Sequence, residues 1–279
     1  MAEPYRPLLT DAARPATYEV EAFNERGEMV PTAIAGEHPL TLYLDKRELV
    51  TLMTLGHAPE ALAIGFLRNQ RLVTALEDIK AVQVDWETES VAVTTNGKSD
   101  IEEKTRKKTV TTGCGQGTVY GDLMEEIGSI KLRDDVFLAD AALFTLVEKV
   151  RKHETIYKQA GAVHGCALAT LEGEILMFVE DVGRHNAVDA IAGFMWLDAI
   201  DGSDKVFYTT GRLTSEMVIK CAQMRIPFLV SRSGLTKMGH DIAQQVGLTM
   251  IGRASGRHYL AFAGTQRLKL TAPQPTAVA

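Results

Sequence analysis

The sequence is poor in cysteine, and this scarcity excludes several classes of protein. Three cysteines occur in 279 residues, at positions 114, 166 and 221. Their number is odd and their spacings match no C-x-x-C zinc pattern, so neither a disulfide framework nor a structural zinc site is expected. Free thiols are typical of a reducing compartment, which predicts a cytoplasmic protein with no metal of its own.

Long apolar runs and an excess of positive charge are also missing. No run approaches the roughly 18 apolar residues of a membrane span, and the start carries Glu3, Asp11 and Arg14 instead of a secretory signal. The formal net charge of -6 disfavours a protein that coats nucleic acid, although a local basic patch is allowed. We therefore expect a soluble protein without nucleic-acid or membrane partners.

What remains is an ordinary globular composition in a chain long enough for one large domain or two modest ones. The sequence is 46% hydrophobic and 24% charged, which is enough to bury a core. A proline-rich start and a change of pattern near residue 137 divide the chain. The parts expected are a flexible arm at 1–16, a smaller α+β part at 17–136, an α/β domain at 137–268 and a disordered tail at 269–279.

Hydrophobic periodicity predicts the elements of both larger parts. In the first part, strands are expected at 18–23, 40–44, 48–55, 81–86 and 90–95, and a helix at 59–69. The second part alternates strands with helices, which indicates a parallel or mixed sheet with both faces covered. It should begin with a helix from about 139 and continue with strands at 165–170, 174–179, 206–209, 228–231 and 248–252 and helices at 184–197, 214–224 and 237–246.

A glycine-flanked cysteine, Gly113-Cys114-Gly115-Gln116-Gly117, is the most informative local feature. Glycines beside a thiol let a partner's sulfur or a bulky ligand come close, and the basic cluster at 104–108 would favour the reactive thiolate. The alternative is a flexible surface turn with an incidental cysteine. A nucleotide loop is disfavoured, because Thr118 stands where G-x-G-x-x-G requires its last glycine.

A second motif, E-D-V-G-R-H-N-A-V-D from Glu180 to Asp189, joins an expected strand to an expected helix. Ligands bind at such carboxyl ends in open α/β sheets. Free amides at the helix start, together with Arg184 and His185, would suit a phosphate group. The alternative is helix capping, with His185 and Asp189 as an ordinary i,i+4 pair.

A third motif follows the last expected strand and comprises Arg253, Ala254, Ser255, Gly256, Arg257 and His258. Its arginines could hold a phosphate or a nucleobase, and the alternative is a solvated hairpin turn. A metal site built from His164, Cys166 and His185 is disfavoured, because the zinc-deaminase pattern H-x-E followed by P-C-x-x-C is absent. Met217 and Cys221, at helical spacing in an apolar helix, are expected in the core.

Taken together, these segments resemble the formate dehydrogenase accessory sulfurtransferase family, FdhD, from about Pro39 to Leu268. The strongest matches are the Glu180 to Asp189 motif and T-G-R-L-T-S-E-M-V from Thr210 to Val218. Supporting matches are found at 162–164, 226–231 and 247–252. The resemblance implies a cytidine-deaminase-like α/β domain without the deaminase zinc, joined to a smaller N-terminal α+β part.

The resemblance also implies an activity. A sulfurtransferase of this family takes persulfide sulfur from a cysteine desulfurase and passes it to the molybdenum or tungsten bis-molybdopterin guanine dinucleotide cofactor, before formate dehydrogenase receives that cofactor. Cys114 corresponds to the persulfide cysteine and the motif at 253–258 to the cofactor-binding loop, and Arg184, His185 and Arg212 are expected to line the same cleft. The family often has C-x-x-C, whereas Gly117 replaces the second cysteine here. One nucleophilic sulfur is enough for a relay.

Cysteine desulfurase and formate dehydrogenase are thus the expected partners, and a homodimer is the expected assembly. Two alternatives remain open. A non-catalytic cofactor-binding chaperone for formate dehydrogenase maturation would share every feature except the need for Cys114. A nucleotide-processing enzyme of deaminase descent would need zinc ligands that the sequence does not show.

Overall fold

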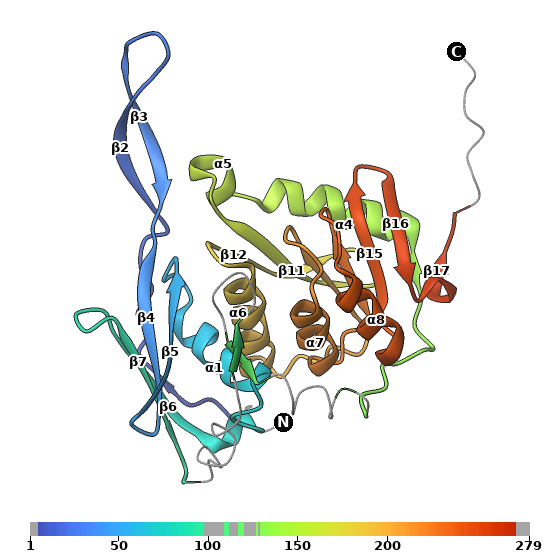
Figure 1. Cartoon of the computed structure of the whole chain (residues 1–279), viewed down its shortest axis with the longest axis horizontal. Coiled ribbons are helices and arrows are strands. Elements are labelled where there is room, and N and C mark those ends of the chain that lie inside the picture. Colours follow the sequence, from blue (N-terminus) through green and yellow to red (C-terminus); the bar gives the residue numbers. More distant parts are fainter. Residues whose placement is uncertain (1–4, 98–108, 112–116, 120–126, 128, 272–279) are drawn as a thin grey trace.

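A computed structural model of the chain describes residues 5–97, 109–111, 117–119, 127 and 129–271. Two larger sheets are combined with helices that lie between and around them (Figure 1). The mixed α/β class predicted from the sequence is therefore confirmed. The more specific cytidine-deaminase-like arrangement remains a prediction. Within the described residues, no helix is long and apolar enough to cross a membrane.

The first sheet has five strands in the order β1-β6-β7-β4-β5. Alternate residues of one strand, Leu40, Leu42 and Leu44, are fully buried, while the residues between them are partly exposed. Successive side chains of a strand point to opposite faces, so only one face of this strand meets the core. The strands of this sheet are Leu8–Leu9 (β1), His38–Leu44 (β4), Arg47–Thr54 (β5), Ile79–Asp85 (β6) and Ser90–Thr95 (β7).

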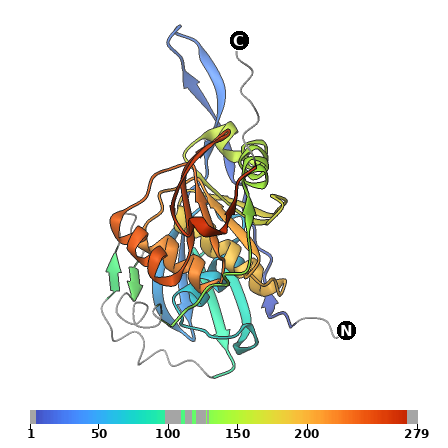
Figure 2. The same cartoon turned by 90° about the vertical axis from the view of Figure 1, so that its right-hand side faces the viewer.

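An antiparallel hairpin of Thr17–Phe23 (β2) and Met29–Ala35 (β3) projects from the body of the molecule (Figures 1 and 2). The sequence predicts β2 but not β3. Pro31 lacks a backbone donor and argues against a central strand. Both strands of a two-stranded hairpin are edge strands, so this proline is tolerated here.

One helix, Pro59–Asn69 (α1), lies between the first sheet and the rest of the molecule, and nearly all its residues are buried. It packs closely against Arg184–Leu197 (α6). A Cβ on Gly65 would lie 1.6 Å from the carbonyl oxygen of Asp189, and a Cβ on Gly193 would lie 1.9 Å from that of Ala61. Glycine at both positions lets the two helix backbones touch.

The second sheet has six strands in the order β12-β11-β13-β14-β15-β16. Its middle strands β13, β14 and β15 are parallel, and the outer pairs are antiparallel. The strands are His164–Thr170 (β11), Ile175–Asp181 (β12), Lys205–Thr209 (β13), Phe228–Ser231 (β14), Thr249–Ser255 (β15) and His258–Ala263 (β16). The motif at 253–258 is therefore the tip of the β15–β16 hairpin.

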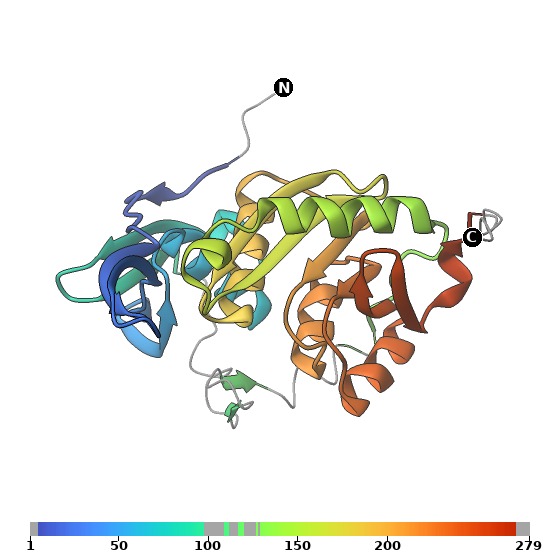
Figure 3. The same cartoon turned by 90° about the horizontal axis from the view of Figure 1, so that it is seen from above.

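Helices cover both faces of the second sheet, as the alternation of strands and helices predicts. Figure 3 shows α4 along one face and α7 and α8 on the other. The helices of this part are Asp140–His153 (α4), Ile156–Ala160 (α5), α6, Ser215–Gln223 (α7) and Lys237–Val246 (α8). Short elements complete the described chain, namely Leu76–Asp78 (η1), Thr109–Thr111 (β8), Gly117–Val119 (β9), Leu138–Ala139 (β10), Thr265–Arg267 (η2) and Leu268–Lys269 (β17).

Two clusters of buried apolar side chains lie on either side of the second sheet. Ala167 and Ala169 belong to the cluster beneath α4, whereas Cys166 and Leu168, which alternate with them along β11, belong to the other. That second cluster runs through α6, α7 and α8 and continues across α1 into the first sheet. The two parts that the sequence divides near residue 137 thus share one core.

The start of the chain differs from the loose arm expected at 1–16. The hydroxyl of Tyr5 donates to the carbonyl oxygen of Ile79 (2.7 Å), and β1 pairs in parallel with β6. The indole N–H of Trp86 donates to the carbonyl oxygen of Ala12. From Tyr5 onward the segment is bound to the first sheet, by contacts with residues about 70 positions away that leave no local sequence pattern.

The end of the chain also differs from expectation where it is described. β17 pairs with β10, and the backbone N–H of Thr271 donates to the Asp140 carboxylate at 3.0 Å. The first residues of the expected tail at 269–279 are therefore held against the start of α4. Residues 1–4 and 272–279 lie outside the described part.

Candidate functional site

The second sheet brings several polar residues to one edge. β13 and β14 are parallel and both end there, as does β12. His164 begins β11 at this edge, Arg184 and His185 begin α6 directly after β12, and Arg212 and Arg232 follow β13 and β14. Three residues expected from the sequence, Arg184, His185 and Arg212, thus come together at the carboxyl ends of the strands.

Glu180, the first residue of the second motif, has a structural role. Its carboxylate accepts hydrogen bonds from the backbone N–H groups of Thr155 (3.0 Å), Ile156 (2.9 Å) and Tyr157 (2.9 Å). The first amides of a helix have no partner within the helix. Glu180 therefore caps α5 and fixes the segment that leads into β11.

Asp181, the next residue, joins the two parts of the molecule. Its carboxylate accepts hydrogen bonds from the Thr54 hydroxyl (2.6 Å) and the Leu55 N–H (3.1 Å), at the end of β5. It also accepts from the Gly183 N–H (3.0 Å) and the Asn186 amide (2.8 Å), at the start of α6. Burial raises the pKa of Asp181, against the effect of these hydrogen bonds. One amide of the expected phosphate site at this helix start is thus already taken by the protein's own carboxylate.

Positive charge gathers around His164. Burial first, and then the charges of Arg184, Arg232 and Arg212, lower the pKa of this imidazole. Its Nδ1 lies 3.3 Å from the hydroxyl of Thr210. The neutral ring therefore lies near three guanidinium groups, of which Arg232 is already paired with the buried carboxylate of Glu154 at 2.8 Å. Positive charge at such an edge attracts anions.

The side chain of Arg184 passes directly over Gly211. A Cβ on Gly211 would lie 2.5 Å from Cδ of Arg184, so any larger residue would displace the arginine. The turn that holds Gly211 is itself fixed, because the hydroxyl of Ser231 donates to its carbonyl oxygen at 2.6 Å. Glycine at this place allows a largely buried arginine to reach the edge.

His185 lies beneath the edge and is almost fully buried. Burial, followed by the charges of Lys220 and Arg184, lowers its pKa to about 2. Its Nε2 lies 3.4 Å from an oxygen of Glu216 on α7. This histidine is therefore neutral at any ordinary pH. The alternative of an i,i+4 pair with Asp189 is wrong, because Asp189 is paired with Lys220 of α7 and the neutral ring of His185 contacts Glu216 of the same helix.

A buried ionic network continues from His185 into the molecule. The ammonium of Lys220 lies 2.8 Å from an oxygen of Asp189 and 3.5 Å from one of Glu216. The other oxygen of Asp189 accepts from the amide of Asn69 on α1 at 2.7 Å. The network joins α1, α6 and α7 and holds the start of α6 in place.

A cleft of about 320 Å³ opens at this edge, between α6 and the first sheet. His164, Arg184 and His185 line it from one side, and Thr51 and Met53 of β5 line it from the other. Arg184 supplies donors and positive charge to this cleft, whereas Arg212, which the sequence predicts to line it, is not among its lining residues. Both histidines have lowered pKa values and suit hydrogen bonding better than proton transfer near neutral pH. The arrangement suits the binding of an anionic ligand.

The motif at 253–258 lies on the same side of the sheet but is more exposed. The backbone N–H of Arg253 donates to the carbonyl oxygen of Ser233 at 2.9 Å, close to Arg232. Ala254 is buried, whereas Arg253, Arg257 and His258 are exposed. The expected hairpin turn is thus observed, and its role in binding a cofactor remains a prediction.

The cysteines divide into two groups. Cys114 lies outside the described residues. Cys166 and Cys221 are free and fully buried. Burial raises the pKa of the Cys166 thiol to about 12 and that of Cys221 well above its ordinary value, so neither readily forms a thiolate. Met217 and Cys221 lie in the core as expected.

No group of three or more His, Cys, Asp or Glu side chains in the described part of the chain has the arrangement of a metal site. His164 and Cys166, considered together in the sequence, have other contacts. The imidazole lies beside Thr210, and the thiol lies 3.3 Å from the hydroxyl of Thr209.

Two groups of site residues are not identified from the sequence. Arg232 stands directly after a predicted strand, and the rule that parallel strands end at one edge could have found it. Lys220 and Glu216 stand four residues apart on a predicted helix, which indicates an ordinary exposed ion pair. Their complete burial depends on the packing of α6 against α7, which no local pattern shows.

Known proteins resemble this chain over most of its length. The model of the FdhD/NarQ family matches residues 35–269. A protein named sulfur carrier protein FdhD from Wolinella succinogenes is 31% identical over 237 residues, which are 85% of this chain and 82% of the relative. Another of that name from Listeria monocytogenes is 29% identical over 254 residues, 90% of this chain and 95% of the relative.

A solved structure agrees with the fold. It is the crystal structure of a protein from Desulfotalea psychrophila, described as a candidate formate dehydrogenase accessory protein. Its TM-score with this chain is 0.76 at 26% sequence identity, over 91% of this chain and all of that one.

Proposed function

The chain belongs to the FdhD/NarQ family, and from this premise we propose that it is a sulfur carrier for the maturation of formate dehydrogenase, with Cys114 as the sulfur-bearing residue. The names of its relatives support the first half of the proposal. The assignment of the sulfur to Cys114 rests on the burial and the raised pKa values of the other two thiols. Cys166 and Cys221 are fully buried with raised pKa values, which leaves Cys114 as the thiol suited to sulfur exchange.

The proposed chemistry is covalent sulfur relay. The thiolate of Cys114 attacks the outer sulfur of a donor persulfide, and the donor's sulfur–sulfur bond breaks. The donor sulfur leaves as a thiolate, and the outer sulfur remains on Cys114 as a new persulfide. A cysteine desulfurase is the proposed donor. The glycines at 113, 115 and 117 support this step, because they leave room around the thiol.

The proposed recipient is the molybdenum or tungsten bis-molybdopterin guanine dinucleotide cofactor, bound as a substrate. Arg184 and Arg212 at the sheet edge, with Arg253 and Arg257 on the β15–β16 hairpin, would bind its phosphate groups through charge-assisted hydrogen bonds. His185, buried and neutral, would support the wall of the cleft beside them. The remaining residues of the hairpin tip, Ala254, Ser255, Gly256 and His258, belong to the same proposed loop.

We further propose a cytoplasmic homodimer whose client is formate dehydrogenase. A reducing compartment suits the free thiols. The proposal does not require a local dithiol, since Gly117 stands where a second cysteine would be found.

The test is client maturation with matched cysteine variants. Cys114→Ala should abolish formate dehydrogenase activity in cells that hold only this variant, while Cys166→Ala should retain it with a modest loss of stability. Because sulfur transfer needs the thiol and cofactor shielding does not, normal client activity with Cys114→Ala would favour the chaperone alternative and refute the relay.

A further inference from the structure

The β2–β3 hairpin, called the arm below, projects from the body of the molecule, and α5 lies near its base (Figures 1 and 2). Each of its strands has seven residues and spans about 23 Å. No residue of either strand is buried. A two-stranded hairpin without a covering layer is only marginally stable in water. The arm therefore presents surface that the described part of this chain leaves uncovered.

One face of the arm combines exposed apolar side chains with carboxylates. Phe23 and Met29 form a cross-strand pair next to the turn and are 73% and 57% exposed. Successive side chains of a strand alternate between its two faces, so Glu19 and Glu21 share the face of Phe23. Exposed apolar side chains that lie together are typical of a surface that binds a partner.

The arm is also acidic. Residues 17–35 contain four glutamates and a single basic residue, Arg26, which gives this segment a net charge of -3. Arg26 lies 3.9 Å from Glu25 in the turn. Among the residues that the structure describes, no cation pairs with Glu19 or Glu21. A partner for this face should therefore offer positive charge together with an apolar contact.

A surface of the opposite character lies where α4 ends and α5 follows. Its exposed side chains include the cations Arg151, Lys152 and Lys158 and the ring of Tyr157, which is 44% exposed. Lys152 pairs with Glu148 at 2.8 Å. Arg151 and Lys158 have no acidic partner within the described ranges. These four exposed side chains, called the α4–α5 surface below, complement a face that carries carboxylates and apolar groups.

Within one copy, the arm and the α4–α5 surface do not satisfy each other. The turn of the arm points away from α5 in both views (Figures 1 and 2), and Phe23 and Met29 flank that turn. In the part of the chain that the structure describes, no ion pair joins the arm to α4 or α5. One copy therefore leaves two complementary surfaces unmatched.

We propose that the arm docks on the α4–α5 surface of a second copy of this chain. The two glutamates of its face meet the guanidinium of Arg151 and the ammonium of Lys158. Phe23 and Met29 supply the apolar contacts, beside the ring of Tyr157. The net charge of the whole chain is -6, so two copies repel each other in general, and the basic α4–α5 surface fixes where an acidic arm can dock.

The size of the arm indicates that the contact forms twice. One arm face, about 23 Å long and two strands wide, is smaller than the roughly 800 Å² per partner that a stable interface buries. In a two-fold dimer each copy gives one arm and one α4–α5 surface, which doubles the contact. Because α5 lies beside the arm of its own copy, the two contacts adjoin. This proposal rests on the homodimer proposed above, and not on the sulfur relay.

The test is analytical ultracentrifugation of the full-length protein over a range of concentrations. Glu19→Lys/Glu21→Lys should weaken the dimer by about tenfold or more, because like charges then meet across the contact. Arg151→Glu/Lys158→Glu should weaken it to a similar extent for the same reason. The variant with all four substitutions should recover most of the loss, because the charges are then exchanged and complementary again. All four side chains are exposed, so the melting temperatures should stay close to that of the wild type.

Lys46→Glu/Lys80→Glu is the matched control, because it changes the net charge as Arg151→Glu/Lys158→Glu does, at exposed positions of the first sheet, and should dimerise like the wild type. Three results would overturn the proposal: a wild type that is monomeric at every concentration, a dimer that neither charge variant weakens, and no recovery with all four substitutions. Persulfide on Cys114 of a monomeric protein would refute the dimer alone. A charge-sensitive dimer that gains no persulfide would refute the relay alone.

Discussion

Replacing Lys220 by methionine should destabilise the protein strongly, because this lysine balances two buried carboxylates. Its side chain is 2% exposed, and its ammonium lies 2.8 Å from Asp189 and 3.5 Å from Glu216. Burial alone would lower the pKa of Lys220, but the two carboxylates outweigh burial and raise it. Removing one partner of a buried ion pair costs about 3–5 kcal/mol, since it leaves charge without compensation.

The loss should also depend on pH. In the variant, Asp189 would be buried without a cation, so its folded pKa, which burial already raises against the effect of Lys220, would rise further above the unfolded value of about 4. A carboxyl group whose folded pKa is raised loses stabilising free energy as pH rises above its unfolded pKa. The difference in unfolding free energy between wild type and variant should therefore grow from pH 4.5 to pH 7, by up to about 1.4 kcal/mol per pH unit for the Asp189 carboxyl group.

Urea denaturation followed by circular dichroism at both pH values measures this difference. The double variant Lys220→Met/Asp189→Asn should recover part of the loss, because an amide at position 189 can still accept the hydrogen bond from Asn69. A cost below about 1 kcal/mol at pH 7, or the same cost at both pH values, would refute the reasoning.

Three further predictions concern the site and the helix contact. His185 has a folded pKa of about 2, below its unfolded value near 6.5, so its contribution to stability is present above pH 6.5 and is lost as pH falls. His185→Gln should therefore flatten the loss of urea stability between pH 6 and pH 4.5, and equal slopes would contradict this. Gly193→Ala places a Cβ 1.9 Å from the carbonyl oxygen of Ala61 and should cost about 3 kcal/mol or more in thermal unfolding, whereas a cost below 1 kcal/mol would show that α1 and α6 can separate freely. Arg253→Ala or Arg257→Ala should weaken GDP binding in calorimetry by about 1.5–3 kcal/mol, and unchanged affinity in both would count against the hairpin as a cofactor site.

Much of the fold can be predicted from the sequence, because most elements carry local signals. α1, α6 and α8 have the bounds that hydrophobic periodicity predicts, and proline at the start of α1 and Gly247 after α8 mark two of their ends. β3 is missed because of Pro31, and β1 because two residues cannot show a period. Such elements form through pairing with distant strands, which a local pattern does not contain.

The candidate site is predictable only in part. The rule that ligands bind at carboxyl ends of strands finds Arg184, His185 and Arg212. It does not show that Glu180 and Asp181 in the same motif have structural roles, since their partners are backbone amides of α5 and side chains of the first sheet. Charged residues in a motif can therefore build a site without contacting its ligand.

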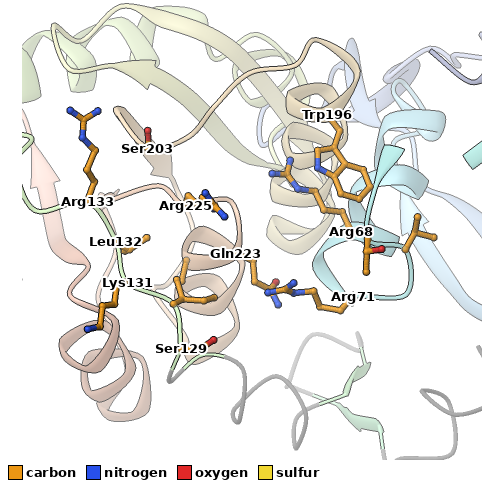
Figure 4. A pocket seen from close by; sticks show the side chains of 14 residues that line it. Arg68, Arg71, Ser129, Lys131, Leu132, Arg133, Trp196, Ser203, Gln223 and Arg225 are labelled. Carbon is orange, nitrogen blue, oxygen red and sulfur yellow. The ribbon is translucent and has the colours of Figure 1, made fainter. Parts of the chain in front are cut away.

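A groove of about 830 Å³ that is lined by the ends of α1, α6 and α7 and by residues 129–133 (Figure 4) is not predictable from sequence. Its arginines come from the ends of α1 and α7 and from residues 129–133, and each one alone is an ordinary basic residue near a helix end or in a loop. Only the packing of these segments brings the charges together. The left-handed conformation of Arg71 and Arg225 becomes visible only in the structure.

The most direct test of the central claim is mass spectrometry after incubation with a cysteine desulfurase and cysteine. Wild type and the double variant Cys166→Ala/Cys221→Ala should both gain one sulfur atom, about 32 Da, on the peptide that contains Cys114, because the buried thiols take no part. Cys114→Ala should gain none. Sulfur on Cys166 or Cys221, or an unmodified Cys114 in a wild-type sample whose desulfurase is active, would contradict the assignment of Cys114 as the sulfur carrier.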